Sequence, residues 1–506
     1  MSKPMLRLIC LVLILALGGA VLASCGSTET PAGETQTGTS AETDPETSAS
    51  PETGEPRLKP DIPETYDFGG ESVDFLCWFL GSWQNTVRTY RDIATPDLTS
   101  DLVNDAVFER NKLIEDNYKV SITMRLVDLG DVSTIIKNQV AVGGGEDAYE
   151  VCYPRLLEFP GFFKNDIVQD ITLVPNIDLS KPWWDQDSIE NLTVVGVLPL
   201  VATALNVNDK DATAALAFNK QAAKDRGITT LYDEVADMEW TVESLMGYCQ
   251  AVGDPDSNGD GNGTADMEDF WAFLGKNDVS TSFFHGIGGK IAKTGEDGKP
   301  VFTAGDPISV EAMEQVVKFM NEPYFFNHHK ANIGSDVFTR MFETNHGLFF
   351  WMRLDEVTAM RGSEVEFGIL PTPMYTAEQN QYYSTVSQHT TGLLSIPKDI
   401  SGDTLNMTGM ILEALAADSY YGLQHAYVDL SLKTKYSSDE ESRESLNTIL
   451  SSRVFDPGIM YNLGGFGTEI QNLGPNKGSL ATKVREYTDK VDSAIRELVE
   501  FLSPEE

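Results

Sequence analysis

The sequence predicts an α/β protein of two lobes, each a mainly parallel sheet flanked by helices, with extended hinge crossings between the lobes. Two observations predict this fold class. The chain has 506 residues, whereas a single hydrophobic core stops growing at roughly 250 to 300 residues. Strand patterns also alternate with helix patterns along the chain, which is typical of a largely parallel sheet covered by helices.

The first part of the folded chain contains two strand–helix–strand units. Strand patterns rich in β-branched and aromatic residues alternate with helical spacing of apolar residues. The strands are expected at 72–78, 120–126 and 148–153, and the helices at 101–119 and 132–142.

The second part continues the alternation. Residues 214–220 predict a strand that runs into a helix, and another helix begins after Trp240, with Thr241 as its N-cap and Ser244 on its first turn. Further helices are expected at 307–320, 405–417 and 480–502, and extended segments at 364–371 and 391–397.

The net charge argues against a nucleic-acid partner. The chain carries 77 acidic and 37 basic residues, a formal net charge of -40, and such a charge repels phosphate backbones. A solvated acidic surface that keeps the protein soluble is the preferred interpretation. Attraction of cations, or an acidic binding face, is the alternative.

The N-terminus has the pattern of an export signal. Lys3 and Arg7 precede an apolar run at 8–23, which is too short and too thinly flanked for a stable membrane span. The run ends in Leu-Ala-Ser-Cys25, which resembles a bacterial lipobox and predicts acylation of the Cys25 thiol. We therefore expect removal of residues 1–24 and a lipid anchor at the outer face of the cell membrane. An ordinary secretory signal that contains a cysteine is the alternative.

A flexible tether is predicted at 25–63. Its composition is dominated by Thr, Glu, Ser, Pro, Gly and Ala without apolar periodicity, so it offers no core to offset the entropy of ordering. A coil of this length reaches about 35 Å. Beyond the tether, Cys77 and Cys152 follow strand patterns, so they could form a disulfide. The alternative is that Cys77, Cys152 and Cys249 are all free buried thiols.

The order of several motifs resembles the family 1 extracellular solute-binding proteins of ABC importers, the maltose-binding-protein-like group. The motifs are Leu-Ala-Phe-Asn-Lys at 216–220, Trp-Thr-Val-Glu at 240–243, the apolar stretch 342–351, Phe-Gly-Ile-Leu-Pro-Thr-Pro at 367–373 and Leu-Leu-Ser-Ile-Pro-Lys at 393–398. The resemblance implies a periplasmic-binding-protein-like fold. It implies lobe one at 64–203 and 376–425, lobe two at 204–375 and 426–506, and crossings near 198–217 and 369–375.

By this resemblance the protein is not an enzyme. It would capture a small solute, with an oligosaccharide preferred, by closing two lobes, and deliver it as a monomer to an ABC permease. The segment 285–290 lacks the spacing of a nucleotide-binding loop. The alternatives are an extracellular lipoprotein hydrolase acting on glycans and a peptide-binding surface lipoprotein.

Candidate ligand residues are aromatic or planar polar side chains that follow predicted strands or lie in loops, because sugars pair an apolar face with hydroxyls. They are Trp78, Trp83, Tyr153, Arg155, Trp183, Trp184, Asp185, Trp351, Arg353, Tyr383 and His389. For Trp351 the resemblance implies a stacking tryptophan. Adjacent tryptophans seldom face one core together, so Trp183 or Trp184 is expected to be exposed or on the ligand. Packing within each lobe is the alternative for the whole set.

A calcium-loop pattern lies between 258 and 269. Oxygen-bearing side chains recur at loop positions 1, 3, 5, 9 and 12, with Gly263 at the sixth position. The predicted ligands of a structural calcium ion are Asn258, Asp260, Asn262, Thr264 (through its backbone carbonyl), Asp266 and Asp269. A metal-free Asx-rich turn is the alternative.

Overall fold

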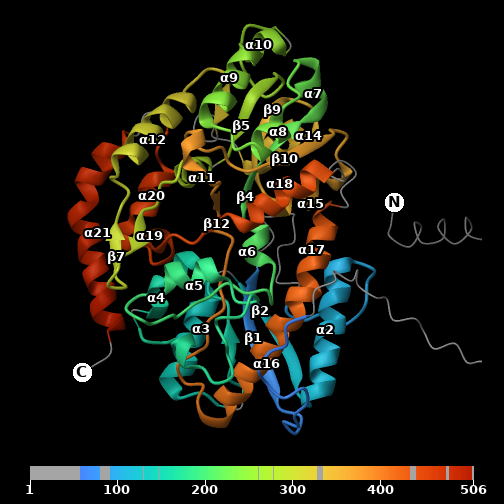
Figure 1. Cartoon of the computed structure of the whole chain (residues 1–506), viewed down its shortest axis with the longest axis vertical. Helices are drawn as coiled ribbons and strands as arrows, with labels where there is room; N and C mark the ends of the chain where they lie inside the picture. The colour runs from blue at the N-terminus through green and yellow to red at the C-terminus, as the bar shows by residue number, and fades with distance from the viewer. Residues whose placement is uncertain are drawn as a thin grey trace, which may run out of the picture. The chain divides into compact units, whose positions relative to one another are not determined.

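Two sheets organise the chain, one in the lower and one in the upper part of Figure 1. The structure is a computed structural model that describes residues 57–79 and 92–503, except 129, 146, 164, 260, 277, 328–333, 433–439 and 475–477. The predicted signal at 1–24, the lipidation site Cys25, the ligand candidate Trp83 and the predicted tether up to residue 56 lie outside these residues. The last part of the predicted tether contacts the folded part, because Leu58 N donates to the Tyr421 hydroxyl at 2.8 Å and the Tyr118 hydroxyl donates to Pro63 O at 2.6 Å. In the described part, every helix is too short or too polar to cross a membrane.

The smaller sheet has the order β2-β1-β3, and all its pairs are parallel. Its strands are β1 (Ser72–Phe79), β2 (Ser121–Asp128) and β3 (Val151–Cys152), joined by α2 (Leu102–Tyr118) and α3 (Asp131–Val142). Each helix provides the crossover that a parallel pair requires. The two predicted strand–helix–strand units are confirmed.

The larger sheet has the order β10-β4-β9-β5-β8. Its strands are β4 (Ala214–Asn219), β5 (Trp271–Gly275), β8 (Phe325–Asn327), β9 (Gly347–Arg353) and β10 (Phe367–Leu370). β5 runs parallel to β8 and β9, but β4 is antiparallel to β9 and β10. The larger sheet is therefore mixed rather than mainly parallel, because β4 runs antiparallel to both of its neighbours.

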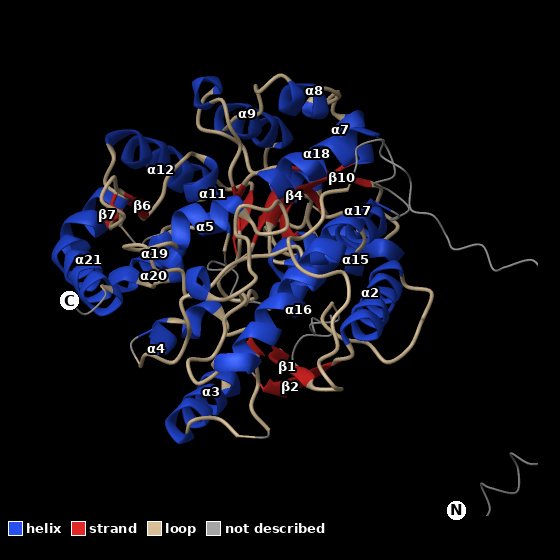
Figure 2. Ribbon diagram, turned by 60° about the horizontal axis from the view of Figure 1, so that its bottom comes forward, coloured by secondary structure: helices blue, strands red, loops and turns tan. Residues whose placement is uncertain are grey.

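Helices cover both sheets (Figure 2). Around the larger sheet lie α7 (Lys220–Asp225), α8 (Leu231–Ala236), α9 (Val242–Val252), α11 (Val279–Gly286), α12 (Pro307–Phe319), α14 (Ser335–Glu343), α15 (Leu354–Ala359) and α18 (Glu440–Ser451). α16 (Gly402–Tyr421) and α17 (Leu423–Leu432) pack against α2. The predicted start of α9 is confirmed, because Thr241 and Ser244 form a capping box.

The C-terminal segments complete the fold. α19 (Pro457–Met460), α20 (Phe466–Gln471) and α21 (Leu480–Leu502) follow β12 (Arg453–Val454), and α21 contacts α12 and the β6 (Ala292–Thr294) and β7 (Pro300–Phe302) hairpin. Shorter helices α4 (Pro160–Phe163), α5 (Gln186–Leu192), α6 (Asn208–Asp211) and α10 (Pro255–Asn258) lie in the connecting loops.

Extended segments join the two sheet regions. Thr213 pairs with Val386, and β11 (Ser384–Thr385) runs parallel to β12. From Gly392 onward the chain pairs with the smaller-sheet region, as in the bridge between Cys152 and Ser395. Residues 367–370 form β10, and Met374 pairs with Thr241 at the start of α9, so the chain is still in the larger-sheet region at Met374 and this crossing lies later than 369–375. The lobe boundaries themselves stay a prediction.

The three cysteines of the described residues are free thiols. Cys77, Cys152 and Cys249 are buried, and burial raises the pKa of each thiol. Of the two interpretations of Cys77 and Cys152, the structure therefore has the free buried pair.

Candidate functional site

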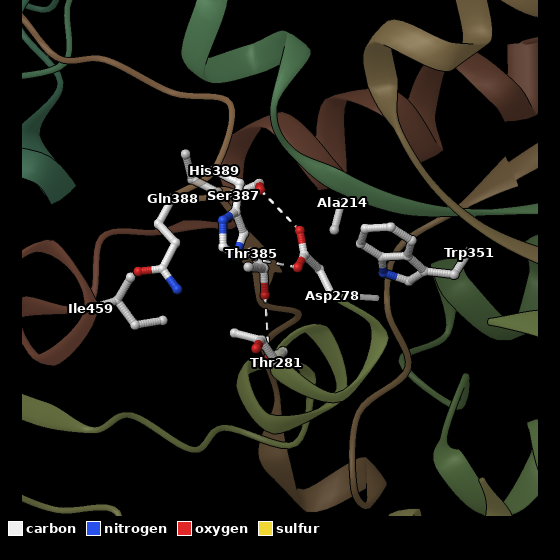
Figure 3. A pocket seen from close by; sticks show the side chains of 10 residues that line it. Ala214, Asp278, Thr281, Trp351, Thr385, Ser387, Gln388, His389 and Ile459 are labelled. Atoms are coloured by element: carbon white, nitrogen blue, oxygen red, sulfur yellow. Dashed lines mark hydrogen bonds and ion pairs between the residues drawn. The ribbon is translucent and has the colours of Figure 1, made fainter. Parts of the chain in front are cut away.

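A pocket opens at the carboxyl edge of the larger sheet, beside the crossing segment that carries β11 (Figure 3). The space that its walls enclose is small, about 10 Å³ or room for about one water molecule, and the rest of the hollow is open to solvent. Its walls are Ala214, Asp278, Thr281, Trp351, Thr385, Val386, Ser387, Gln388, His389 and Ile459. Open α/β sheets bind ligands at this edge, so the pocket is the candidate solute site.

Asp278 supplies the fixed charge of the pocket. It is the N-cap residue of α11, yet its carboxylate makes no cap hydrogen bond to that helix. Its Oδ2 instead accepts from the Ser387 hydroxyl at 3.1 Å, and its Oδ1 accepts from Gln471 Nε2 at 2.6 Å. The side chain is thus turned from the helix and held in the pocket wall by two donors.

Trp351 forms the opposite wall. It lies on β9 two residues before the strand's last residue, Arg353, and only 1% of it is exposed. Its indole Nε1 has no hydrogen-bond partner among the described residues, and neither has the Thr281 hydroxyl. Figure 3 shows the indole nitrogen on the side of the ring that faces Asp278. A buried polar group without a hydrogen bond destabilises the folded state unless a ligand or a water molecule forms that bond.

His389 lies at the pocket rim and is partly exposed. Its Nε2 is 3.0 Å from Gln471 Nε2 and 3.7 Å from Asp278 Oδ1. One glutamine thus contacts both the histidine and the carboxylate. Of the candidates taken from the sequence, the structure brings Trp351 and His389 into this one pocket.

Trp183 and Trp184 are both fully buried, so the expected exposure of one of them is wrong, whereas a role of either in ligand binding stays a prediction. Trp183 Nε1 donates to Glu413 Oε1 at 3.1 Å, and Trp184 Nε1 donates to Glu413 Oε2 at 2.8 Å. A single carboxylate on α16 therefore satisfies both indoles inside one core. Burial raises the pKa of Glu413, and the indole hydrogen bonds partly offset the rise.

The other candidates of the smaller-sheet region lie outside the pocket walls. Trp78 and Tyr153 are buried in its core. Arg155 forms an ion pair with Glu158, with 3.4 Å between Nε and Oε1. Asp185 caps α5 by accepting from Ser188 N at 2.8 Å. Their roles in ligand binding stay predictions.

The remaining two candidates also have partners elsewhere. Arg353 Nε is 3.4 Å from Asp355 Oδ1. Tyr383 is half-buried, and Lys290 Nζ lies 5.9 Å from the centre of its ring. Burial raises the pKa of the Tyr383 hydroxyl, with a further contribution from Asp187.

The predicted calcium loop is a chain of Asx turns in its described part. Asn262 Oδ1 accepts from Thr264 N at 2.8 Å, and Asp266 Oδ1 accepts from Glu268 N at 2.9 Å. Asp260 and the side chain of Asn258 are outside the described residues. Among the residues described, no group of three or more acidic, histidine or cysteine side chains is arranged to hold a metal ion. Calcium binding stays a prediction.

Sequence reasoning missed Asp278, Gln388 and Gln471. Asp278 follows β5 after a short loop, so its place at a strand's carboxyl end was a usable signal. Gln471 carried no such signal. It lies 193 residues from Asp278 in the sequence and reaches the pocket only through the packing of α20 on α11.

Comparisons of the sequence with family models and with curated proteins find no match. Solved structures do match the fold. An ABC substrate-binding protein from Listeria monocytogenes in complex with cycloalternan is 12% identical, covers 84% of this chain and 99% of its own, and has a TM-score of 0.52. The GacH receptor of Streptomyces glaucescens, described with acarbose, is 13% identical, covers 85% of this chain and 99% of its own, and has a TM-score of 0.52.

A third match is UgpB from Mycobacterium tuberculosis in complex with glycerophosphocholine. It is 13% identical over 85% of this chain and 100% of that chain, with a TM-score of 0.53. The solutes named for these proteins differ in charge and chemistry, so the fold alone leaves the ligand open. The likeness covers the elements from both sheet regions, and the chain therefore has the two-lobed α/β fold of ABC substrate-binding proteins.

Proposed function

We propose that this protein is an exported, lipid-anchored solute-binding protein that captures an oligosaccharide between its lobes and delivers it to the permease of an ABC importer. One observation carries the proposal. A pocket at the carboxyl edge of the larger sheet presents a buried indole, with its N–H unpaired among the described residues, opposite a held carboxylate. Sugars supply both an apolar face for the ring and hydroxyls for the polar atoms.

The arrangement supports capture through closure. The pocket walls come from the larger sheet, from α11 and from the crossing segment 384–389. A solute that bridges these walls and the facing lobe stabilises the closed form by its differential affinity for the two forms. The predicted acyl group on Cys25 and the tether at 25–63 would keep the binding unit near a membrane permease.

The test is ligand-dependent stability and shape of the full chain. Its melting temperature is scanned against malto-, cello-, xylo- and manno-oligosaccharides and against tri- and pentapeptides. A ligand at 100 times its dissociation constant stabilises the folded state by about 2.7 kcal/mol, so a binding sugar raises the melting temperature measurably. Small-angle scattering with that sugar is expected to give a smaller radius of gyration.

Three outcomes would contradict the proposal. Stabilisation by peptides but by no sugar would favour the peptide-binding lipoprotein. Cleavage of a bound glycan, detected by mass spectrometry after long incubation, would favour the hydrolase. Release of the full-length protein from cells in a form with a free, unacylated cysteine would remove the lipid anchor from the proposal.

A further inference from the structure

The pocket contains one desolvated carboxylate, and its lining includes no lysine or arginine to pair with it. Asp278 is 8% exposed, and the ten lining residues include neither lysine nor arginine. The donors that hold its carboxylate, the Ser387 hydroxyl and the Gln471 amide, are neutral. His389 is the one basic side chain of the lining, and its Nε2 is 3.7 Å from Asp278 Oδ1.

Cations near the pocket are already neutralised by other acids. Lys276, the first residue after β5, is bonded to Glu356. Arg353, two residues after Trp351, pairs with Asp355. Arg453 pairs with Asp185 and Asp209. An anion that entered the pocket would therefore meet the Asp278 carboxylate with no lysine or arginine in the lining, and with His389 as the one basic side chain beside it.

A ligand group that bonds to both Asp278 and Trp351 must donate one hydrogen bond and accept another. The Trp351 N–H is a donor that lacks an acceptor among the described residues, and the Asp278 carboxylate accepts only. A hydroxyl group fills both roles. A carboxylate or phosphate offers an acceptor to Trp351 but no proton to Asp278, and it brings a like charge into a site with low dielectric.

We infer that Asp278 and Trp351 together make the pocket selective for hydroxyl-bearing solutes without negative charge, and that Asp278 is the residue that rejects anionic ones. This inference rests on the proposed solute-binding function. It narrows the ligand to neutral or amino-bearing glycans and excludes uronates, aldonates and sugar phosphates. The fold alone does not require this, since glycerophosphocholine occupies a protein of the same fold.

The experiment measures binding of matched neutral and anionic disaccharides to the full chain by titration calorimetry. The pairs are maltose with maltobionate, cellobiose with cellobionate, and galactobiose with digalacturonate. For any pair in which a member binds, the neutral sugar is expected to bind at least about tenfold more tightly, because like charges about 4 Å apart repel strongly at a protein site.

Two variants assign the selectivity to residues. Asp278→Asn keeps the shape and one acceptor oxygen but removes the charge, so the gap between neutral and anionic members is expected to close to about threefold or less. Trp351→Phe keeps the ring but removes the N–H, so neutral sugars are expected to bind about three- to tenfold more weakly. The matched controls are Asp336→Asn, an exposed acid on α14, and Trp271→Phe, whose indole donates to Asp266 O at 2.7 Å outside the pocket.

The outcomes separate this inference from the proposed function. Anionic members that bind as tightly as neutral ones, or an Asp278→Asn variant with unchanged selectivity, overturn the inference and leave solute binding intact. If no sugar from the panel binds, the oligosaccharide function itself falls and the inference falls with it. If Asp278→Asn does not fold, as judged by its melting curve, the affinities of the wild type for neutral and anionic disaccharides and those of Trp351→Phe still test the inference.

Discussion

Arg453 donates a hydrogen bond to the carboxylate of Asp185, although 268 residues separate the two in the sequence. The same guanidinium approaches Asp209, with 3.4 Å between Nε and Oδ2. Asp185 caps α5 and Asp209 lies in α6, while Arg453 begins β12. The arginine thus connects the start of α5, the helix α6 and the strand β12.

Replacement of Arg453 by Met should destabilise the protein strongly. Burial alone would lower the pKa of Arg453, but the carboxylates of Asp185 and Asp209 more than offset it and the pKa is raised. Removing the cation leaves two carboxylates without their shared partner in a largely buried site, and breaking such a pair costs about 3 to 5 kcal/mol. The measurement is urea unfolding of the full chain, followed by tryptophan fluorescence.

Arg443→Met is the matched control. Arg443 and Asp429 are about half exposed, and their closest atoms are 3.7 Å apart. A surface pair of this kind contributes about 0 to 1 kcal/mol. Equal losses of stability in the two variants would contradict the role assigned to Arg453.

Glu413→Gln should weaken the core that contains the paired tryptophans. The carboxylate accepts from both indole nitrogens, whereas an amide has only one accepting oxygen and directs N–H groups at the other indole. One buried donor is then left unsatisfied, which costs about 1 to 3 kcal/mol. Urea unfolding measures the loss, and a shift in near-ultraviolet circular dichroism is expected from the disturbed indoles.

The control for this variant is Glu314→Gln, which changes an exposed acid on α12. We expect it to alter the free energy of unfolding by less than about 0.5 kcal/mol. Should Glu413→Gln be as mild as this control, the two indole hydrogen bonds would not stabilise the fold as described.

The order and type of the elements could be predicted from the sequence because they are local properties. β1, α2, β2 and α3 follow the spacing of their apolar residues, and α9 begins at a capping box formed within four residues. The place of the crossings could not be predicted in this way. It depends on the pairing of Thr213 with Val386, and no local pattern reports which distant segment a strand end will meet.

The candidate site was predicted in part for the same reason. Trp351 and His389 stand next to strand or loop signals that sequence alone displays, and both line the pocket. The partners that define their chemistry come from far along the chain, as Gln471 does for Asp278. The same distance explains why the sequence wrongly predicted that Trp183 or Trp184 would be exposed, since their acceptor Glu413 lies 230 and 229 residues away, respectively.

Calcium should raise the melting temperature of the full chain if the loop at 258–269 binds it as predicted. At 100 times its dissociation constant the ion stabilises the folded state by about 2.7 kcal/mol. Asp266→Asn should abolish the shift, whereas Asp336→Asn on α14 should keep it. A melting temperature that is unchanged between excess calcium and excess chelator would instead establish the metal-free Asx turns.

Glu150 should make the stability of the protein fall as the pH rises from about 4.5 to about 7. Its carboxylate is buried beside Asp74, whose backbone N–H donates to Oε2 at 2.7 Å. Burial, with smaller contributions from the charges of Asp74 and Asp399, raises the pKa of Glu150 to about 7. Between the unfolded and folded pKa values the folded state holds a proton that the unfolded state has released, so each rise in pH favours unfolding.

Glu150→Gln should remove this slope, because its amide keeps the acceptor for Asp74 N and cannot ionise. The difference in unfolding free energy between the variant and the wild type is measured in urea at several pH values from 4 to 8. The variant should gain stability relative to the wild type as the pH rises, and Glu71→Gln, an exposed neighbour, should show no such trend. A constant difference across this range would mean that Glu150 ionises at its ordinary pKa and that its site is better solvated than its burial implies.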